Sequence, residues 1–149
     1  MPYNTDHALE RMRELVAMQV PFAHQGCTAS GLDCVGGLRF ALQYDEPVLN
    51  YSQDPVNGEL ERELRRILGA PIFYRANIKT DSVVTNAIMR PLDIVSMHYA
   101  GPVRHVGMIG DYPADGELSL IHTSASIGRV VEHRLDDKWR RRIVGVWRP

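Results

Sequence analysis

The sequence predicts an α+β domain in which amino-terminal helices pack on an antiparallel sheet. Apolar residues recur at helical spacing in most of the segments before Pro91, whereas after it they gather into short strand-like runs separated by turn residues. A chain of 149 residues is long enough to bury a core without disulfides or metals. We therefore expect one domain over residues 1–149, with a sheet of about five to six strands.

The helical segments are defined by apolar stripes and by stop signals. Asp6–Met18 carries an apolar face of five residues and a charged opposite face. A second helix starts within the stretch Ser30–Leu38 and is expected to run to about Tyr44. Glu59–Leu68 has one apolar face and is followed by Gly69 and Pro71, which end a helix. Asp81–Met89 is expected to form a short helix with Val84, Ala87 and Ile88 facing inward.

The remaining elements are mainly short strands, rich in β-branched and other apolar residues. They are Ile72–Tyr74, Asp93–Met97, His105–Ile109, Leu118–His122, Arg129–His133 and Ile143–Trp147. A short helix over Asp136–Arg140 is expected between the last two strands.

Composition excludes several classes of protein. The formal net charge of -1 gives no electrostatic reason to bind nucleic acid. No stretch reaches the ~20 apolar residues that cross a bilayer, and the amino terminus lacks the pattern of a secretory signal. We expect synthesis in a reducing cytoplasm and no membrane insertion. Cys27 and Cys34 make no disulfide framework or zinc motif. Nothing in the sequence indicates a metal or an organic cofactor, and we expect neither.

The stretch Ser30–Leu38 places a cysteine at the start of a helix. Ser30 and Asp33 have the spacing of a capping box, which predicts that Cys34 lies in the first turn. Unpaired backbone N–H groups and the helix dipole favour a thiolate there, while the charge of Asp33 raises the pKa of the thiol. A free cysteine is also often simply a small buried residue, and Cys27 is interpreted as an inert loop thiol that can modulate Cys34 by oxidation.

Two histidines lie on strands that are predicted to follow this helix. His105 and His122 each occupy a strand of the sheet, and neighbouring strands can bring both imidazoles to the amino end of the cysteine helix. Acyl transfer by a thiolate needs a nucleophile, a base and a group that orients the base. A helix-borne cysteine followed by strand-borne histidines has the order of a papain-like site.

Three motifs carry a family resemblance. Gly31–Gly36, Arg104–Met108 and Leu120–Thr123 together resemble the NlpC-type family of papain-like cell-wall peptidases. The end of the chain, from Gly128 to Ile143, is similar to the branch found in tailed phages and gene transfer agents. The resemblance covers roughly residues 10–40 and 90–149. Residues 45–90 match no known pattern and are interpreted as an insertion.

The resemblance implies a papain-like fold and a catalytic triad. Cys34 would be the nucleophile, His105 the general base and His122 the residue that orients His105. The substrates would be amide bonds in peptidoglycan stem peptides, and the partners would be hub or baseplate proteins of a phage-like tail that acts in the cell wall or periplasm. The alternative is a structural tail-tip or baseplate subunit that keeps the fold with weak or lost catalysis.

One position departs from the family pattern. Family members carry a Tyr before the cysteine whose hydroxyl helps the oxyanion hole, but the corresponding place here holds Pro21-Phe22. His24, Gln25 or the backbone N–H of Cys34 is the candidate substitute, and losing one such donor costs ~10²–10³ in rate. Asp33 is expected to cap the helix or to bind a substrate amine.

Five further features are interpreted without a catalytic role. The histidines His98 and His133 are read as surface or structural residues. The tryptophans Trp139 and Trp147 are read as core or interface residues, with the core favoured. The run Arg140–Arg142 is read as a solvated face, with contact to acidic cell-wall polymers or to a tail protein as the alternative.

Overall fold

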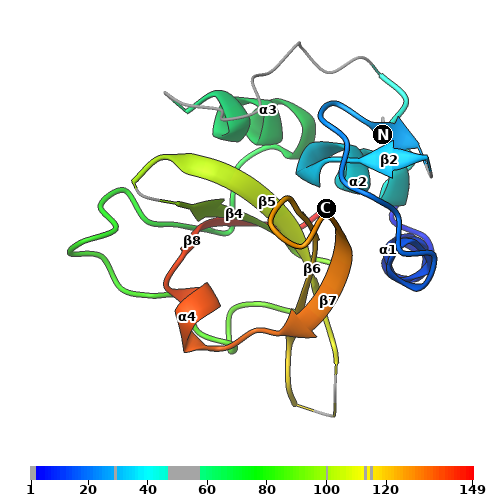
Figure 1. The fold of residues 1–149 in the computed structure, drawn as a ribbon. Coiled ribbons are helices and arrows are strands. Elements are labelled where there is room, and N and C mark those ends of the chain that lie inside the picture. Colours follow the sequence, from blue (N-terminus) through cyan, green and yellow to red (C-terminus); the bar gives the residue numbers. More distant parts are fainter. Residues whose placement is uncertain (1–2, 29, 47–57, 100, 113, 115) are drawn as a thin grey trace.

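The predicted α+β architecture is confirmed in a computed structural model, which describes residues 3–28, 30–46, 58–99, 101–112, 114 and 116–149. Helices and strands follow one another along the chain as shown in Figure 1. The elements are α1 (Ala8–Ala17), β1 (Cys27–Thr28), β2 (Gly31–Leu32), α2 (Cys34–Ala41), α3 (Glu59–Leu68), β3 (Phe73–Tyr74), β4 (Ile94–His98), β5 (Val103–Gly110), β6 (Ser119–Ser124), β7 (Arg129–Arg134), α4 (Asp137–Arg140) and β8 (Ile143–Trp147). No helix among the described residues is long and apolar enough to cross a membrane.

The main sheet has six antiparallel strands in the order β3-β8-β4-β5-β6-β7. The strand β8 therefore lies between β3 and β4, although it is the last element in the chain. The strand β5 pairs with β4 over most of its length but with β6 only over Met108–Gly110. The two strands thus separate on the side of His105, and α2 contacts both of them.

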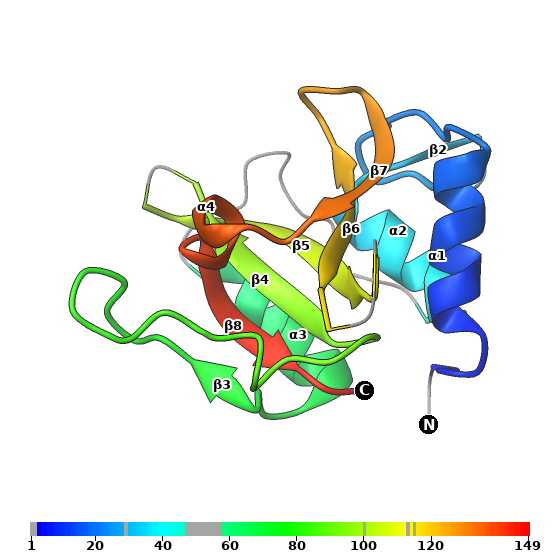
Figure 2. The ribbon, with the colours of Figure 1, turned by 90° about the horizontal axis from the view of Figure 1, so that it is seen from below.

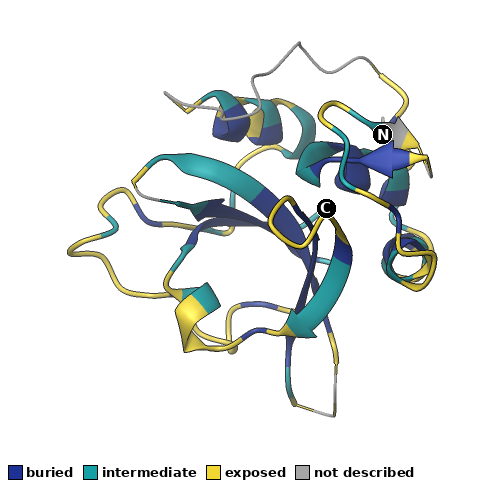
Figure 3. Cartoon of the chain, in the orientation of Figure 1, coloured by how far each residue is buried: buried dark blue, intermediate teal, exposed yellow. Residues whose placement is uncertain are grey.

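The two faces of the sheet are covered by different parts of the chain. The helices α1, α2 and α3 lie on one side, and α4 lies on the other (Figures 1 and 2). Leu15, Leu38 and Leu64 pack against the first face, where they meet Val106 and Met108 of β5. The second face carries its own apolar cluster, which includes Ile109 and Ile143. Both faces of the central strands are consequently buried (Figure 3).

Most predicted elements are confirmed, but one helix is wrong. The segment 81–89 forms no helix: Val84 and Met89 are buried on the second face of the sheet, whereas Ala87 and Ile88 are exposed. Two buried residues five positions apart suit an irregular chain that crosses a sheet better than one face of a helix. The helix α2 also ends at Ala41 rather than near Tyr44, because Gln43 adopts a positive φ of 52° that a right-handed helix does not allow.

Candidate active site

The amino terminus of α2 is capped by Asp33, not by Ser30. The capping box predicted at Ser30 is wrong because Cys27–Thr28 and Gly31–Leu32 pair as antiparallel strands, with Cys27 opposite Leu32, and the helix starts only after the second of them. One carboxylate oxygen of Asp33 accepts the N–H of Gly36 at 2.7 Å, and the other accepts the N–H of Gln25 at 2.7 Å. The expected capping role of Asp33 is thereby confirmed, and the same buried side chain ties the preceding loop to the helix.

Gly36 allows this loop to lie directly on the first turn of α2. A Cβ atom at Gly36 would overlap the carbonyl oxygen of Gly26. The Asp33 N–H also donates to that carbonyl at 3.3 Å. A glycine at this position therefore lets the loop pack closely enough to fix the start of the helix, and with it the position of Cys34.

Cys34 is the first residue of α2 and a free, half-buried thiol. Burial raises the pKa of the Cys34 thiol to about 12, and the carboxylate of Asp33 adds to this rise. The backbone N–H groups of Val106, Val35 and Cys34 itself act in the opposite direction but do not prevail. In this structure desolvation therefore favours the neutral thiol, against the preference of the helix terminus for a thiolate. The effect of Val106 places the thiol beside β5, one residue from His105.

Three imidazoles form a continuous chain across β5, β6 and β7. His105 Nε2 lies 2.6 Å from His122 Nδ1, and His122 Nε2 lies 2.9 Å from His133 Nε2. His133 Nδ1 lies 2.9 Å from the backbone carbonyl of Arg134. The pairing of Leu120 with His133 across β6 and β7 puts the second and third rings on the same face of the sheet. The structure thus brings His105 and His122 together, as the sequence predicts, and adds His133.

Aromatic rings and one arginine surround this chain. The Tyr99 ring meets His105 edge-on at 5.8 Å between centroids, and the Trp139 ring lies 5.1 Å from His122 and 4.8 Å from His133. The Arg142 guanidinium lies over both aromatic rings, 4.5 Å from the centroid of Tyr99 and 4.7 Å from that of Trp139. Burial raises the pKa of the Tyr99 hydroxyl, Arg142 acts against this rise, and a negative charge on Cys34 would add to it. Tyr99 therefore lies within electrostatic reach of the thiol and in contact with His105.

Burial keeps the first two imidazoles neutral. Desolvation and, as the smaller cause, the positive charge of Arg142 together lower the pKa of His105 to about 4. Desolvation, His105 and His133 together lower the pKa of His122 to about 2. Among the described residues, the Cys34 thiol makes no hydrogen bond to an imidazole. The resting site therefore holds a neutral thiol and a neutral base, and catalytic hydrogen bonds often tighten only when substrate is bound.

These pKa values predict a broad pH–rate profile for any reaction that uses Cys34 and His105. The reactive form needs an unprotonated His105, so kcat/KM should fall as the pH drops through about 4. The reactive form also needs a protonated Cys34 thiol, because this proton is the one that is transferred to His105. We therefore expect no fall in kcat/KM on the alkaline side until the pH approaches about 12. Steady-state kinetics from pH ~3 to ~10 would measure this. An acid limb near the ordinary imidazole pKa of ~6.5 would show instead that His105 is solvated.

The remaining predicted site residues lie around the amino end of α2. The Phe22 backbone N–H donates to the Gly128 carbonyl at 2.8 Å, and its half-buried ring offers no donor. His24 Nδ1 lies 3.9 Å from a carboxylate oxygen of Asp33 at the surface. The side chain of Cys27 and residues 47–57, which fall within the interpreted insertion, lie outside the described part of the structure.

Four residues of the histidine cluster were not recognised as site residues from the sequence: Tyr99, His133, Trp139 and Arg142.

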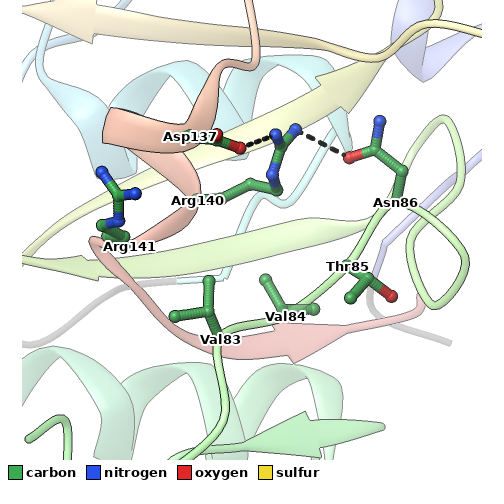
Figure 4. Close-up of a pocket in the computed structure, with 7 residues that line it drawn as sticks. All are labelled: Val83, Val84, Thr85, Asn86, Asp137, Arg140 and Arg141. Atoms are coloured by element: carbon green, nitrogen blue, oxygen red, sulfur yellow. Dashed lines mark hydrogen bonds and ion pairs between the residues drawn. The ribbon is translucent and has the colours of Figure 1, made fainter.

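The interpretation of Arg140–Arg142 as a solvated face is wrong for two of its members, because only Arg141 is exposed. Arg140 binds Asp137, Asn86 and the Leu135 carbonyl, beside an open groove of about 460 Å³ (Figure 4). Trp147 is fully buried, as predicted. The two-residue alternation of β6 and β7 is the signal that could have placed His133 beside His122.

The fold and this site define a papain-like α+β domain with a cysteine at a helix terminus and histidines on the sheet. No family model and no curated protein matches the chain. Among the solved structures that are similar to it, two carry the NlpC/P60 fold, which this chain shares. One is an NlpC/P60 family protein from Bacillus cereus ATCC 10987, with 17% identity and a TM-score of 0.56 over 97% of this chain and 39% of that one. The chain thus spans less than half the length of that protein.

The second similar structure is the NlpC/p60 domain of the peptidoglycan hydrolase SagA. It is 14% identical, with a TM-score of 0.55, and the match covers 98% of this chain and 99% of the domain. The predicted fold class is confirmed by both likenesses. Among the residues that the structure describes, no group of three or more histidine, cysteine or acidic side chains is arranged to hold a metal ion.

Proposed function

We propose that this chain is a cysteine peptidase that hydrolyses amide bonds in the stem peptides of peptidoglycan. The observation that carries the proposal is the 2.6 Å contact between His105 and His122, on the strand next to a helix-terminal Cys34. The SagA domain, which shares the fold, is described as part of a peptidoglycan hydrolase. Chemistry and fold therefore support the same class of reaction.

Each site residue has a role in the proposed reaction. His105 accepts the proton of the Cys34 thiol as the sulfur attacks the amide carbonyl, and it returns that proton to the departing amine. The resulting thioester is hydrolysed by water, which His105 activates in turn. The backbone N–H of Cys34 at the start of α2 stabilises the oxyanion, since Phe22 supplies no donor. His122 holds the His105 ring in place.

Digestion of purified peptidoglycan tests the proposal. The wild-type protein and Cys34→Ala are incubated with wall material from several bacteria, and soluble products are identified by mass spectrometry. We expect stem-peptide fragments from the wild type alone, and the new termini in those fragments name the bond that is cut. Release of the same fragments by Cys34→Ala would contradict the assignment of the nucleophile. Circular dichroism of both proteins controls for folding.

We also propose that the peptidase works as part of a phage-like tail during cell-wall penetration. The support is the similarity of the stretch from Gly128 to Ile143 to tail-associated members of the family. Its hub or baseplate partners would carry the protein to the wall. If the folded wild-type protein releases nothing from any wall, the structural tail-tip or baseplate role becomes the favoured alternative. Purification of assembled tail particles and mass spectrometry of their subunits would test this placement.

A further inference from the structure

The imidazole chain ends at a group whose hydrogen-bonding role is fixed. The carbonyl oxygen of Arg134 can only accept, so the 2.9 Å contact requires that His133 Nδ1 carry the proton. The other nitrogen of a neutral His133, Nε2, then presents a lone pair. It lies 2.9 Å from His122 Nε2, which must therefore carry the proton of that hydrogen bond.

The same reasoning passes from His122 to His105. A neutral imidazole has one N–H, so His122 Nδ1 is an acceptor once Nε2 is the donor. His105 Nε2, at 2.6 Å, must then donate to it. The nitrogen of His105 that remains unprotonated is Nδ1. A single backbone carbonyl at the far end of the chain thus determines which nitrogen of His105 can act as a base.

We propose that His133 is a positioning residue that sets the tautomers of His122 and His105, so that Nδ1 of His105 is the catalytic base. This inference rests on the proposed function, in which His105 takes the proton of Cys34. It extends the predicted Cys34–His105–His122 triad by a fourth member that touches no reacting atom. His133 acts only through His122.

The surroundings of His105 and His122 favour their neutral forms. Trp139 packs against both His122 and His133, and the guanidinium of Arg142 lies over the Trp139 ring. Arg142 also acts electrostatically on His105, so a second positive charge in the cluster would be repelled. If His133 were protonated, its Nε2–H would donate to His122. The donor and the acceptor would then exchange roles in both hydrogen bonds between the imidazoles. His105 Nδ1 would carry a proton instead of a lone pair.

The tautomers can be measured without relying on activity. The full-length protein is labelled with ¹⁵N-histidine, and long-range ¹H–¹⁵N spectra are recorded near neutral pH. We expect the Nε2–H form for His105 and His122 and the Nδ1–H form for His133, with resonances assigned by single His→Gln replacements. The Nδ1–H form for His105 in the wild type would overturn the proposal, whether or not any variant folds.

Two variants of His133 separate positioning from simple packing. His133→Phe fills space but accepts no hydrogen bond, so His122 and His105 should lose their single tautomers and hydrolysis should fall about 10- to 100-fold. His133→Gln offers an amide oxygen to His122 Nε2–H, and it should restore both tautomers and a rate close to that of the wild type. Unchanged tautomers in His133→Phe would overturn the proposal. The expected wild-type tautomers without Cys34-dependent hydrolysis would instead contradict the proposed function alone.

Discussion

Replacing either Cys34 or His105 by alanine is expected to lower kcat/KM for stem-peptide hydrolysis by at least about 10³-fold. The two residues act in one proton transfer, so neither is useful without the other. The double variant Cys34→Ala/His105→Ala should therefore be no slower than either single variant. A defined stem-peptide substrate and a chromatographic assay of its products would measure the three rates.

His98→Ala is the matched control for this comparison. His98 is also a half-buried histidine at the end of a strand of the sheet, but its Nε2 lies 3.2 Å from the Arg141 carbonyl rather than in the imidazole chain. We expect it to retain nearly the full rate. If His105→Ala also retains its activity while Cys34→Ala does not, another group takes the proton from the thiol.

Replacing Arg148 by methionine is expected to cost about 3–5 kcal/mol of unfolding free energy. Asp93 is buried at 1% exposure, and Arg148 binds both of its carboxylate oxygens, at 2.8 and 2.7 Å. In the variant, the Asp93 carboxylate would keep the hydrogen bond that it accepts from the backbone N–H of Arg90 at 2.9 Å. Arg148→Met keeps most of the aliphatic length of the side chain but leaves the buried Asp93 carboxylate without its charged partner. Urea unfolding followed by circular dichroism would measure the loss.

Two further variants test that explanation. Arg134→Met removes a surface pair with Glu117, whose side chains are 62% and 42% exposed, and it should cost only about 0–1 kcal/mol. Adding Asp93→Asn to Arg148→Met should recover part of the stability, because a neutral amide is cheaper to bury than an unpaired carboxylate. Equal unfolding midpoints for Arg148→Met and Arg134→Met would refute a stabilising role for the buried pair.

The local patterns in the sequence predicted the elements that are stabilised locally. The helix α3 has the predicted bounds, Glu59–Leu68, because a wide apolar face and the C-cap Gly69, with a φ of 83°, are both visible in the sequence. The strands from β4 to β8 differ from their predicted ranges by a few residues at most. For these segments, periodicity and turn residues contain most of the information.

Features fixed by distant contacts were not predictable in this way. The segment 81–89 is irregular because Val84 and Met89 fill the second face of the sheet, and that face is built from strands that come later in the chain. The pairing of β1 with β2 delays the helix start beyond Ser30, since Asp33 is needed to hold the preceding loop. Each case depends on a partner far away in sequence or on an irregular loop.

The candidate site shows the same division. The pairing of His105 with His122 followed from their places on neighbouring strands. Arg142 was missed because an arginine next to a turn carries no sequence signal that distinguishes it from a solvated one, and the alternation that could have placed His133 beside His122 also needs the register of the two strands. Their roles depend on the register of β6 with β7 and on stacking with Tyr99 and Trp139.

The place of β8 in the sheet also determines the order in which the protein can be assembled during translation. Because β8 lies between β3 and β4, the sheet stays divided on the ribosome until residues 143–147 have been made. Arg142, which directly precedes β8, joins the histidine cluster only in that last step. Until then β4 has an open edge that can pair with other nascent chains. A cell that makes this protein therefore faces a brief need to protect the exposed strand edge with chaperones until the last strand has joined the sheet.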